Sequence, residues 1–319
     1  MSANLLAARP ASRSRPGTLA RMQQAITLGA LLLTVGWAAW FLQQQRPVLA
    51  AAGAALILGG YALVLGFEML LVRLTHQDDP TPRAGFMALL RAWWAEVLAA
   101  PAVFCWRQPF RSQLWPDQLP ATVANSQDGP RGVVFIHGFV CNRGVWNPWL
   151  KELTAQDTPF IAVNLEPVFS SIDDVLAIVE DAVQRVEAAT GRAPVVVAHS
   201  MGGLVLRRWW AEHNGAQRIH HAITIGTPHQ GTWLARWGHT VNARQMRQAS
   251  AWLASLVQRE QPAGAQRFTC FYSHCDNIVF PPCMAMLPGA DNRHLPGYAH
   301  VHMNDAPEAR AELQRQLAN

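Results

Sequence analysis

Ser200 lies in a stretch whose residue types could support nucleophilic catalysis. In PVVVAHSMGGLVLRRWW (residues 194–210), three valines predict a buried strand and the apolar residues after the glycines predict a helix. The serine would sit on a tight turn between them, with the small residues Ala198 and Gly202 two positions to either side. Such a turn directs the backbone N–H of Met201 and the helix N-terminus to the place where an attacked carbonyl would develop negative charge. A serine at this position could also simply cap the helix.

Four further motifs accompany the serine turn in a recognisable order. They are FIHGFVCNRGVW (135–146), IGTPHQGT (225–232), SHCDNIVFPP (273–282) and GYAHVHM (297–303). Together with the turn they resemble the α/β-hydrolase superfamily, and specifically its bacterial lipases and esterases, over residues 131–302. The turn departs from the superfamily pattern G-x-S-x-G, because Ala198 replaces the first glycine. Alanine is the smallest alternative.

The resemblance implies a serine hydrolase whose catalytic residues follow the chain order Ser, Asp, His. It assigns Ser200 as the nucleophile, His300 as the base and Asp276 as the acid that orients the base. A serine hydroxyl is a poor nucleophile at neutral pH, so a histidine must take its proton and a carboxylate must fix the tautomer of that histidine. The backbone N–H groups of Phe139 and Met201 would form the oxyanion hole. The resemblance implies no cofactor and no metal.

Two of these assignments have rivals nearby in the sequence. Asp276 is preferred to Asp291 because it directly follows a strand-like run. His300 is preferred to His302 because its spacing from Gly297 matches the G-x-x-H of the family. The remaining histidines near the motifs lack metal-ligand spacing and are expected to support the structure: His137, His199, His220, His221 and His229.

The elements that would position these residues alternate between strands and helices from residue 132 onward. Strand-like runs lie at 132–138, 160–165, 193–200, 219–226 and 267–273, and helical patterns at 171–190, 201–214 and 307–318. Short, continuous apolar strands separated by helices predict a mostly parallel sheet with helices on both faces, the α/β-hydrolase type. Residues 131–319 are therefore predicted to form the catalytic domain, with Gly191 as the C-cap of the helix at 171–190.

The N-terminal part has a different composition. Residues 25–42 hold no charge and residues 48–72 hold only Glu68, and each run is long enough to cross a bilayer core of about 30 Å as a helix. The five residues between them cannot form a domain. Residues 1–84 are therefore predicted to be a tail and a two-helix transmembrane hairpin, and not a cleaved signal peptide.

The distribution of arginine predicts the orientation of this hairpin. Four arginines precede the first apolar run and five follow the second, whereas Arg46 alone lies between them: Arg9, Arg13, Arg15 and Arg21, then Arg73, Arg83, Arg91, Arg107 and Arg111. Basic residues remain on the cytoplasmic side. With the resemblance to bacterial proteins, this predicts a multi-pass protein of the bacterial inner membrane whose catalytic domain faces the cytoplasm. The five cysteines show no paired spacing, which agrees with that compartment.

Residues 85–130 are predicted to be an amphipathic segment followed by a linker. The segment 85–115 is rich in tryptophan but lacks the uncharged length of a span, so it would either lie at the membrane interface or pack on the catalytic domain. The net charge of +5 does not predict nucleic-acid binding, because the arginines are scattered and Lys151 is the only lysine. Many of these arginines could contact anionic lipid head groups instead.

The apolar surroundings and the predicted anchor favour a lipophilic acyl ester as substrate. Apolar residues between 233 and 260 could line an acyl groove or could be ordinary core: Trp233, Trp237, Met246, Trp252 and Leu256. The same catalytic residues would also suit a thioesterase or an acyltransferase. A non-catalytic membrane scaffold that retains the fold is the alternative from another functional class.

Overall fold

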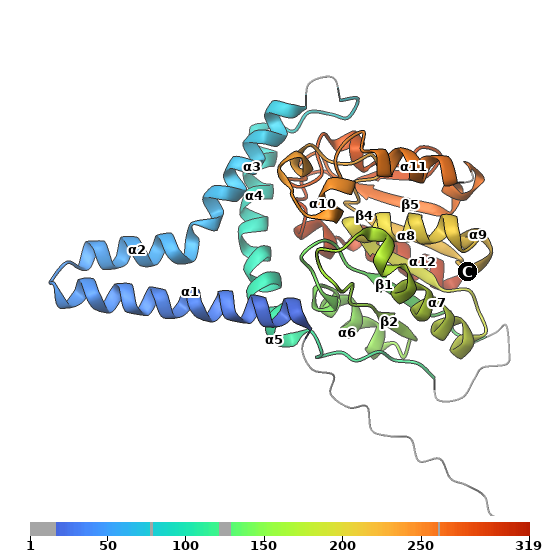
Figure 1. Cartoon of the computed structure of the whole chain (residues 1–319), viewed down its shortest axis with the longest axis horizontal. Helices are drawn as coiled ribbons and strands as arrows, with labels where there is room; N and C mark the ends of the chain where they lie inside the picture. The colour runs from blue at the N-terminus through green and yellow to red at the C-terminus, as the bar shows by residue number, and fades with distance from the viewer. Residues whose placement is uncertain (1–16, 77–78, 121–128, 261) are drawn as a thin grey trace, which may run out of the picture.

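The computed structural model describes residues 17–76, 79–120, 129–260 and 262–319 (Figure 1). The predictions for Arg9, Arg13, Arg15 and residues 121–128 of the linker lie outside the described residues. The described chain forms a body built on one sheet, with two helices, α1 and α2, that project from it.

The body contains a six-stranded sheet in the order β2-β1-β3-β4-β5-β6, with every neighbouring pair parallel. The strands are β1 (Val133–Ile136), β2 (Phe160–Ala162), β3 (Val195–His199), β4 (His221–Ile225), β5 (Phe268–Tyr272) and β6 (Asp291–His294). The predicted parallel sheet is therefore confirmed. The first five strands are fully apolar or nearly so because both faces of the sheet are covered.

Helices bury both faces of this sheet. Val134 and Ile136 of β1 face a core with α7 (Leu176–Thr190), α8 (Met201–Glu212) and α11 (Ala251–Arg259). The alternate residues of the same strand face the opposite core, which includes side chains of α6 (Asn147–Ala155) and α12 (Pro307–Ala318). The shorter helical segments of the body are η2 (Arg143–Trp146), η3 (Ile172–Val175), α9 (Gly215–Arg218), η4 (Trp233–Trp237), α10 (Val241–Gln245), η5 (Pro262–Arg267), η6 (Pro282–Ala285) and η7 (His302–Asp305).

The helix predicted at 171–190 shows how the sequence fixes an element. Ser171 and Asp174 form a capping box at its start, which opens as the 3₁₀ turn η3 and continues as α7. The helix ends at Gly191, whose φ of 68° is the left-handed conformation that favours glycine. The prediction of Gly191 as the C-cap is confirmed.

The N-terminal region forms α1 (Thr18–Gln43), α2 (Pro47–Gly59) and α3 (Tyr61–Thr75). The first predicted span is one continuous helix, long and apolar enough to cross a membrane. The second is not straight, because α2 and α3 meet at Gly60 with a bend of 51°. A Cβ at Gly60 would lie 2.5 Å from the carbonyl oxygen of Leu56, so the close approach at this break requires glycine.

The segment after α3 forms α4 (Phe86–Pro101), the wide π-helical turn η1 (Ala102–Arg107) and α5 (Gln108–Arg111). Pro101 has no N–H to donate, and the π turn follows it directly. Contrary to the expectation from its charges, the combined helix Phe86–Arg111 is also long and apolar enough to cross a membrane. In the structure it packs along α3 and the body (Figure 1), which matches the predicted alternative of a helix packed on the catalytic domain.

Candidate active site

Ser200 lies between β3 and α8, at the sharp turn that its sequence predicts. Its φ and ψ are 54° and −129°, a conformation that non-glycine residues rarely adopt. A Cβ at Gly202 would lie 2.5 Å from the carbonyl oxygen of Ile136, so a larger residue there would force α8 away from β1. Ala198 is fully buried at the other side of the turn. The small residues therefore allow the helix to begin directly above the sheet.

Asp276 and His300 lie together in the structure. Both carboxylate oxygens of Asp276 are 3.0 Å from Nδ1 of His300. The Oδ1 atom also accepts the backbone N–H groups of Ile278 at 2.9 Å and Val279 at 2.8 Å, which fixes the carboxylate in place. Gly226, at the end of β4, has a φ of 55°, and a Cβ there would lie 3.2 Å from both side chains of the pair.

Opposing effects set the pKa of His300. Burial alone would lower the pKa, but the charge of the Asp276 carboxylate and its hydrogen bond raise it above the ordinary value, with further contributions from Glu96 and Glu68. The ring of His199 also faces the His300 ring, at a centroid distance of 4.7 Å. Since Asp276 accepts from Nδ1, the neutral imidazole leaves Nε2 as an acceptor.

Ser200, His300 and Phe139 line one cavity of about 290 Å³. A Cβ at Gly138 would lie 2.8 Å from the Ser200 Cβ, so the backbone before Phe139 passes directly over the serine side chain. Met201 is the first residue of α8. The structure thus brings together all five residues singled out in the sequence, at the carboxyl ends of the parallel strands.

The two rival residues lie in other surroundings. Asp291 is half-exposed on β6, where its carboxylate pairs with Arg293 at 2.5 Å. The imidazole of His302 stacks on Tyr298, with ring centroids 4.8 Å apart, and burial lowers its pKa.

Two other buried histidines, His137 and His229, have structural partners. His137 accepts the Leu165 N–H at Nε2 and donates from Nδ1 to the Gly138 carbonyl, and burial lowers its pKa to about 4. It therefore holds the loop before Phe139 as a neutral side chain. Nε2 of His229 lies 3.0 Å from the hydroxyl of Thr224. Among the described residues, no group of three or more His, Cys, Asp or Glu side chains is arranged to hold a metal ion.

Glu96 of α4, which no sequence motif indicated, reaches the loop of residues 297–303 that carries His300, the histidine loop. Glu96 is 2% exposed, and its two oxygens accept the backbone N–H groups of Val301 at 3.0 Å and His302 at 2.9 Å. These N–H groups immediately follow His300. A helix outside the sheet therefore fixes the loop that carries the predicted base.

Glu68 of α3 makes a similar connection through Asn277. The Asn277 side chain donates to Glu68 Oε2 at 2.6 Å and accepts the backbone N–H of His300 at 3.1 Å. On the opposite side of the cavity, Gln23 of α1 donates to Gln108 of α5 at 3.0 Å. The backbone carbonyl of Gln108 in turn accepts from the Asn142 side chain at 3.0 Å. The N-terminal helices thus hold the loops on both sides of Ser200.

A signal for both glutamates was present in the sequence. Glu68 is the only charged residue in the apolar run 48–72, and Glu96 is the only acidic residue between 85 and 115. An ionisable residue in an otherwise apolar helix is costly unless it has partners, and it commonly marks a functional site. The identity of the partners, however, depends on contacts across some 200 residues of sequence.

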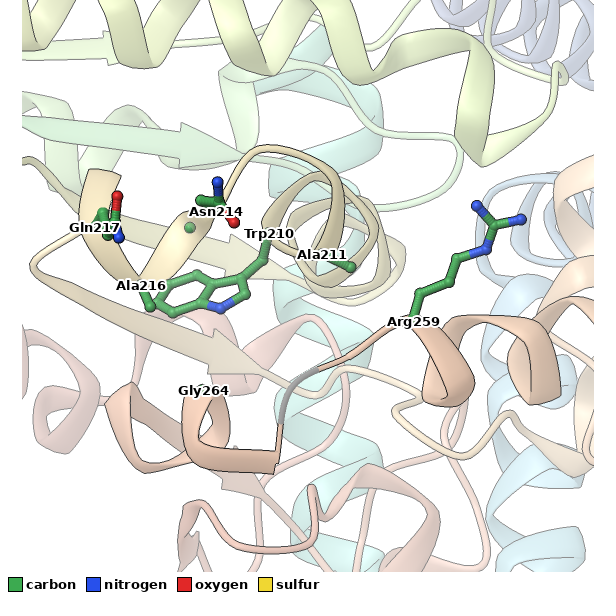
Figure 2. Close-up of a pocket in the computed structure, with 8 residues that line it drawn as sticks. Trp210, Ala211, Asn214, Ala216, Gln217, Arg259 and Gly264 are labelled. Atoms are coloured by element: carbon green, nitrogen blue, oxygen red, sulfur yellow. The ribbon is translucent and has the colours of Figure 1, made fainter.

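The apolar residues between 233 and 260 do not line this cavity. Met246 and Leu256 are buried in the core, and Trp233 packs on Phe280 with ring centroids 5.8 Å apart. Figure 2 shows a different, smaller cavity of about 110 Å³ around Trp210, near the C-terminal end of α8. It contains none of the predicted site residues, so it plays no part in the arrangement around Ser200.

Comparisons with known proteins agree with this fold. A model of the alpha/beta hydrolase family matches residues 133–318. No curated protein matches the sequence. Among solved structures, the mature lipase BlEst2 of Bacillus licheniformis is 17% identical, with a TM-score of 0.53 over 61% of this chain and 95% of that one. Aspergillus fumigatus lipase B is 18% identical, with a TM-score of 0.54 over 93% of this chain and 80% of that one.

At such low identities the solved structures establish the fold alone. The family model, in contrast, covers more than half of the chain and spans the strands, the serine turn and the histidine loop. The chain belongs to the alpha/beta hydrolase family.

Proposed function

We propose that this protein is a membrane-anchored serine hydrolase that cleaves carboxylic esters of lipophilic acyl groups. The observation that carries the proposal is the buried Asp276–His300 pair, which lies at the cavity that also contains the strained Ser200. The two lipases with similar folds support ester hydrolysis, and the apolar helices support the anchor.

In the proposed mechanism, Nε2 of His300 takes the proton of the Ser200 hydroxyl as Oγ attacks the ester carbonyl. Asp276 keeps the Nδ1–H tautomer and stabilises the imidazolium that forms. The N–H groups of Phe139 and Met201 bind the oxygen of the tetrahedral intermediate. His300 then gives the proton to the leaving alcohol, and water attacks the acyl-serine through the same base to release the acid.

The anchor places this reaction at a membrane. We propose that α1 and the bent pair α2–α3 insert into the bilayer of the bacterial inner membrane. The arginines that follow α3, such as Arg83 and Arg91, would keep the sheet-containing body on the cytoplasmic side. The substrate is then an acyl ester present in, or delivered to, that membrane.

Labelling with a fluorophosphonate probe tests the proposed nucleophile. The full-length protein in detergent should be labelled covalently, and the Ser200→Ala variant should not. Ser255→Ala on α11 is a matched control and should be labelled like the wild type, since Ser255 does not line the cavity of Ser200. A folded wild-type protein that stays unlabelled would refute the hydrolase and leave the non-catalytic scaffold.

Comparing matched esters and thioesters, with and without an acyl acceptor, separates a hydrolase from a thioesterase or acyltransferase.

Glu96→Gln should impair turnover and change its pH dependence. The amide keeps one acceptor oxygen but turns an NH₂ group toward the second backbone N–H, and a buried unpaired donor costs about 1–3 kcal/mol. If the loop loses its position to that extent, kcat should fall about 10- to 100-fold. Activity is lost as pH falls through the raised pKa of His300, because only the neutral imidazole is a base. Without the Glu96 charge that pKa is lower, so the acidic limb of kcat/KM should move to lower pH.

Glu312→Gln provides the control for this measurement. Glu312 is also 2% exposed, but it lies on α12 and pairs with Arg293 instead of the histidine loop. Its substitution can lower stability but should leave the acidic limb in place. An unchanged pH profile in Glu96→Gln would show that Glu96 only supports the fold.

A further inference from the structure

A second cavity lies among the N-terminal helices, outside the family fold. It has a volume of about 630 Å³, is open to the surface, and is lined by α1, α2, α3 and the end of α4 with η1. Its lining is almost entirely apolar, with aliphatic side chains such as Ile26, Leu31, Leu58 and Val64. Several of these are exposed, including Ile26 at 63% and Val64 at 58%. The mouth of this cavity therefore lies on the surface that the proposed anchor presents to lipid.

The two cavities share three wall residues. Leu65 of α3, Ala100 of α4 and Phe104 of η1 line both the cavity of Ser200 and the cavity of the N-terminal helices. The cavity of Ser200 therefore adjoins the apolar space between the helices, and these three side chains form the boundary between the two. Polar groups such as His300 and Asn277 line the first cavity, whereas hydrocarbon side chains of α1 and α2 line the second.

We propose that the cavity among the N-terminal helices is a groove that binds the acyl chain of a membrane lipid ester. The chain would enter this groove from the bilayer between α1, α3 and η1. The inference rests on the proposed hydrolase function and adds the position of the acyl chain. In that mechanism the acyl group stays attached to Ser200 while the alcohol leaves. An apolar groove that adjoins the cavity of Ser200 suits the part of the substrate that is retained. The predicted lining residues between 233 and 260 line neither cavity.

The physical consequence is a preference for long acyl chains. Each CH₂ group buried in an apolar site contributes about 0.8 kcal/mol. While the groove fills, each added CH₂ should therefore raise kcat/KM by about fourfold, if the transition state retains the contact. The acetyl group of an acetate ester fits within the cavity of Ser200. Its kcat/KM should therefore not depend on the residues that line only the groove.

A matched pair of substitutions on α3 tests the groove. Leu65→Trp places a bulky ring at the junction of the two cavities, whereas Leu63→Trp makes the same change at a position that is 69% exposed and lines neither cavity. The measurement is kcat/KM for p-nitrophenyl esters from acetate to palmitate in detergent micelles. Leu65→Trp should lower the ratio of kcat/KM for palmitate to kcat/KM for acetate at least tenfold, while Leu63→Trp should leave this ratio as in the wild type.

The possible results separate the two proposals. If the wild type hydrolyses both short and long esters and Leu65→Trp changes neither, the groove is wrong and the hydrolase stands. If the wild type hydrolyses no ester, the proposed function fails and the groove fails with it. If Leu65→Trp loses acetate hydrolysis as well through misfolding, Ala100→Leu at the same junction decides between these outcomes with a smaller insertion.

Cys105 gives an independent readout of occupancy. It is exposed and lines the groove, whereas Cys141, Cys270 and Cys275 are buried and Cys283, which is partly buried, lines neither cavity. Reaction of Ser200 with a dodecyl fluorophosphonate should slow modification of Cys105 by a maleimide at least severalfold, and reaction with an ethyl analogue should not. Equal maleimide rates after both treatments would overturn the assignment of the chain to this groove.

Discussion

His300→Ala is expected to lower kcat for a p-nitrophenyl ester by about four to six orders of magnitude. No other group takes the proton from the Ser200 hydroxyl in the proposed mechanism, so the loss should equal that of Ser200→Ala. The double variant should be no worse than either single variant, since the two residues act in one step. The measurement is steady-state hydrolysis by all three variants, with the reaction in buffer without protein as the background.

His302→Ala is the matched control for this prediction. The two histidines are separated by one residue, but the His302 imidazole stacks on Tyr298 instead of contacting Asp276. Its removal should change kcat only a few-fold. If His302→Ala were the inactive variant and His300→Ala remained active, the assignment of the base would be wrong.

Asp276→Asn should lower kcat by about 10⁴-fold while leaving the protein folded. The asparagine oxygen can still accept the N–H groups of Ile278 and Val279, so the loop keeps its backbone contacts. Its NH₂ group, however, would face Nδ1 of His300 and stabilise the tautomer with the proton on Nε2. That tautomer cannot take the proton of Ser200.

Thermal unfolding and activity measured on the same sample distinguish this effect from a loss of structure. The expected result is an unfolding temperature within a few degrees of the wild type together with the large loss of kcat. Asp291→Asn should retain nearly full activity, because its partner is Arg293 at the edge of the sheet. An active Asp276→Asn variant would exclude Asp276 from the proposed mechanism.

The sheet could largely be predicted from the sequence because its strands are buried on both faces. Runs such as Val195–Val197 have apolar side chains on both faces of the strand, which is the pattern of a parallel sheet covered on both sides. The edge strand β6 was not predicted, since its sequence DNRH is polar and its side chains are partly exposed. Only its pairing with β5 defines it as a strand.

The residues around Ser200 could be predicted for a different reason. The turn itself is local, and steric limits at Gly202 and Ala198 leave a recognisable pattern in the sequence. The pairing of Asp276 with His300 came from the family motifs and not from any local rule. The contacts of Glu68 and Glu96 had no motif, because they join apolar helices to loops more than 200 residues away. The bend at Gly60 was missed because the apolar run continues through it.

Because Glu96 of α4 binds the loop that carries His300, the cavity of Ser200 includes residues from outside the region that matches the family. The family match begins at residue 133, yet Leu65, Glu68, Glu96 and Phe104 all contribute walls to the cavity of Ser200. A polypeptide reduced to residues 133–318 would keep the sheet and Ser200. It would lose the part of the cavity wall that these four residues form, which would expose the site to solvent. The helices of the proposed anchor thus also form part of the wall of the proposed site, so an unrelated tether in their place would remove that wall.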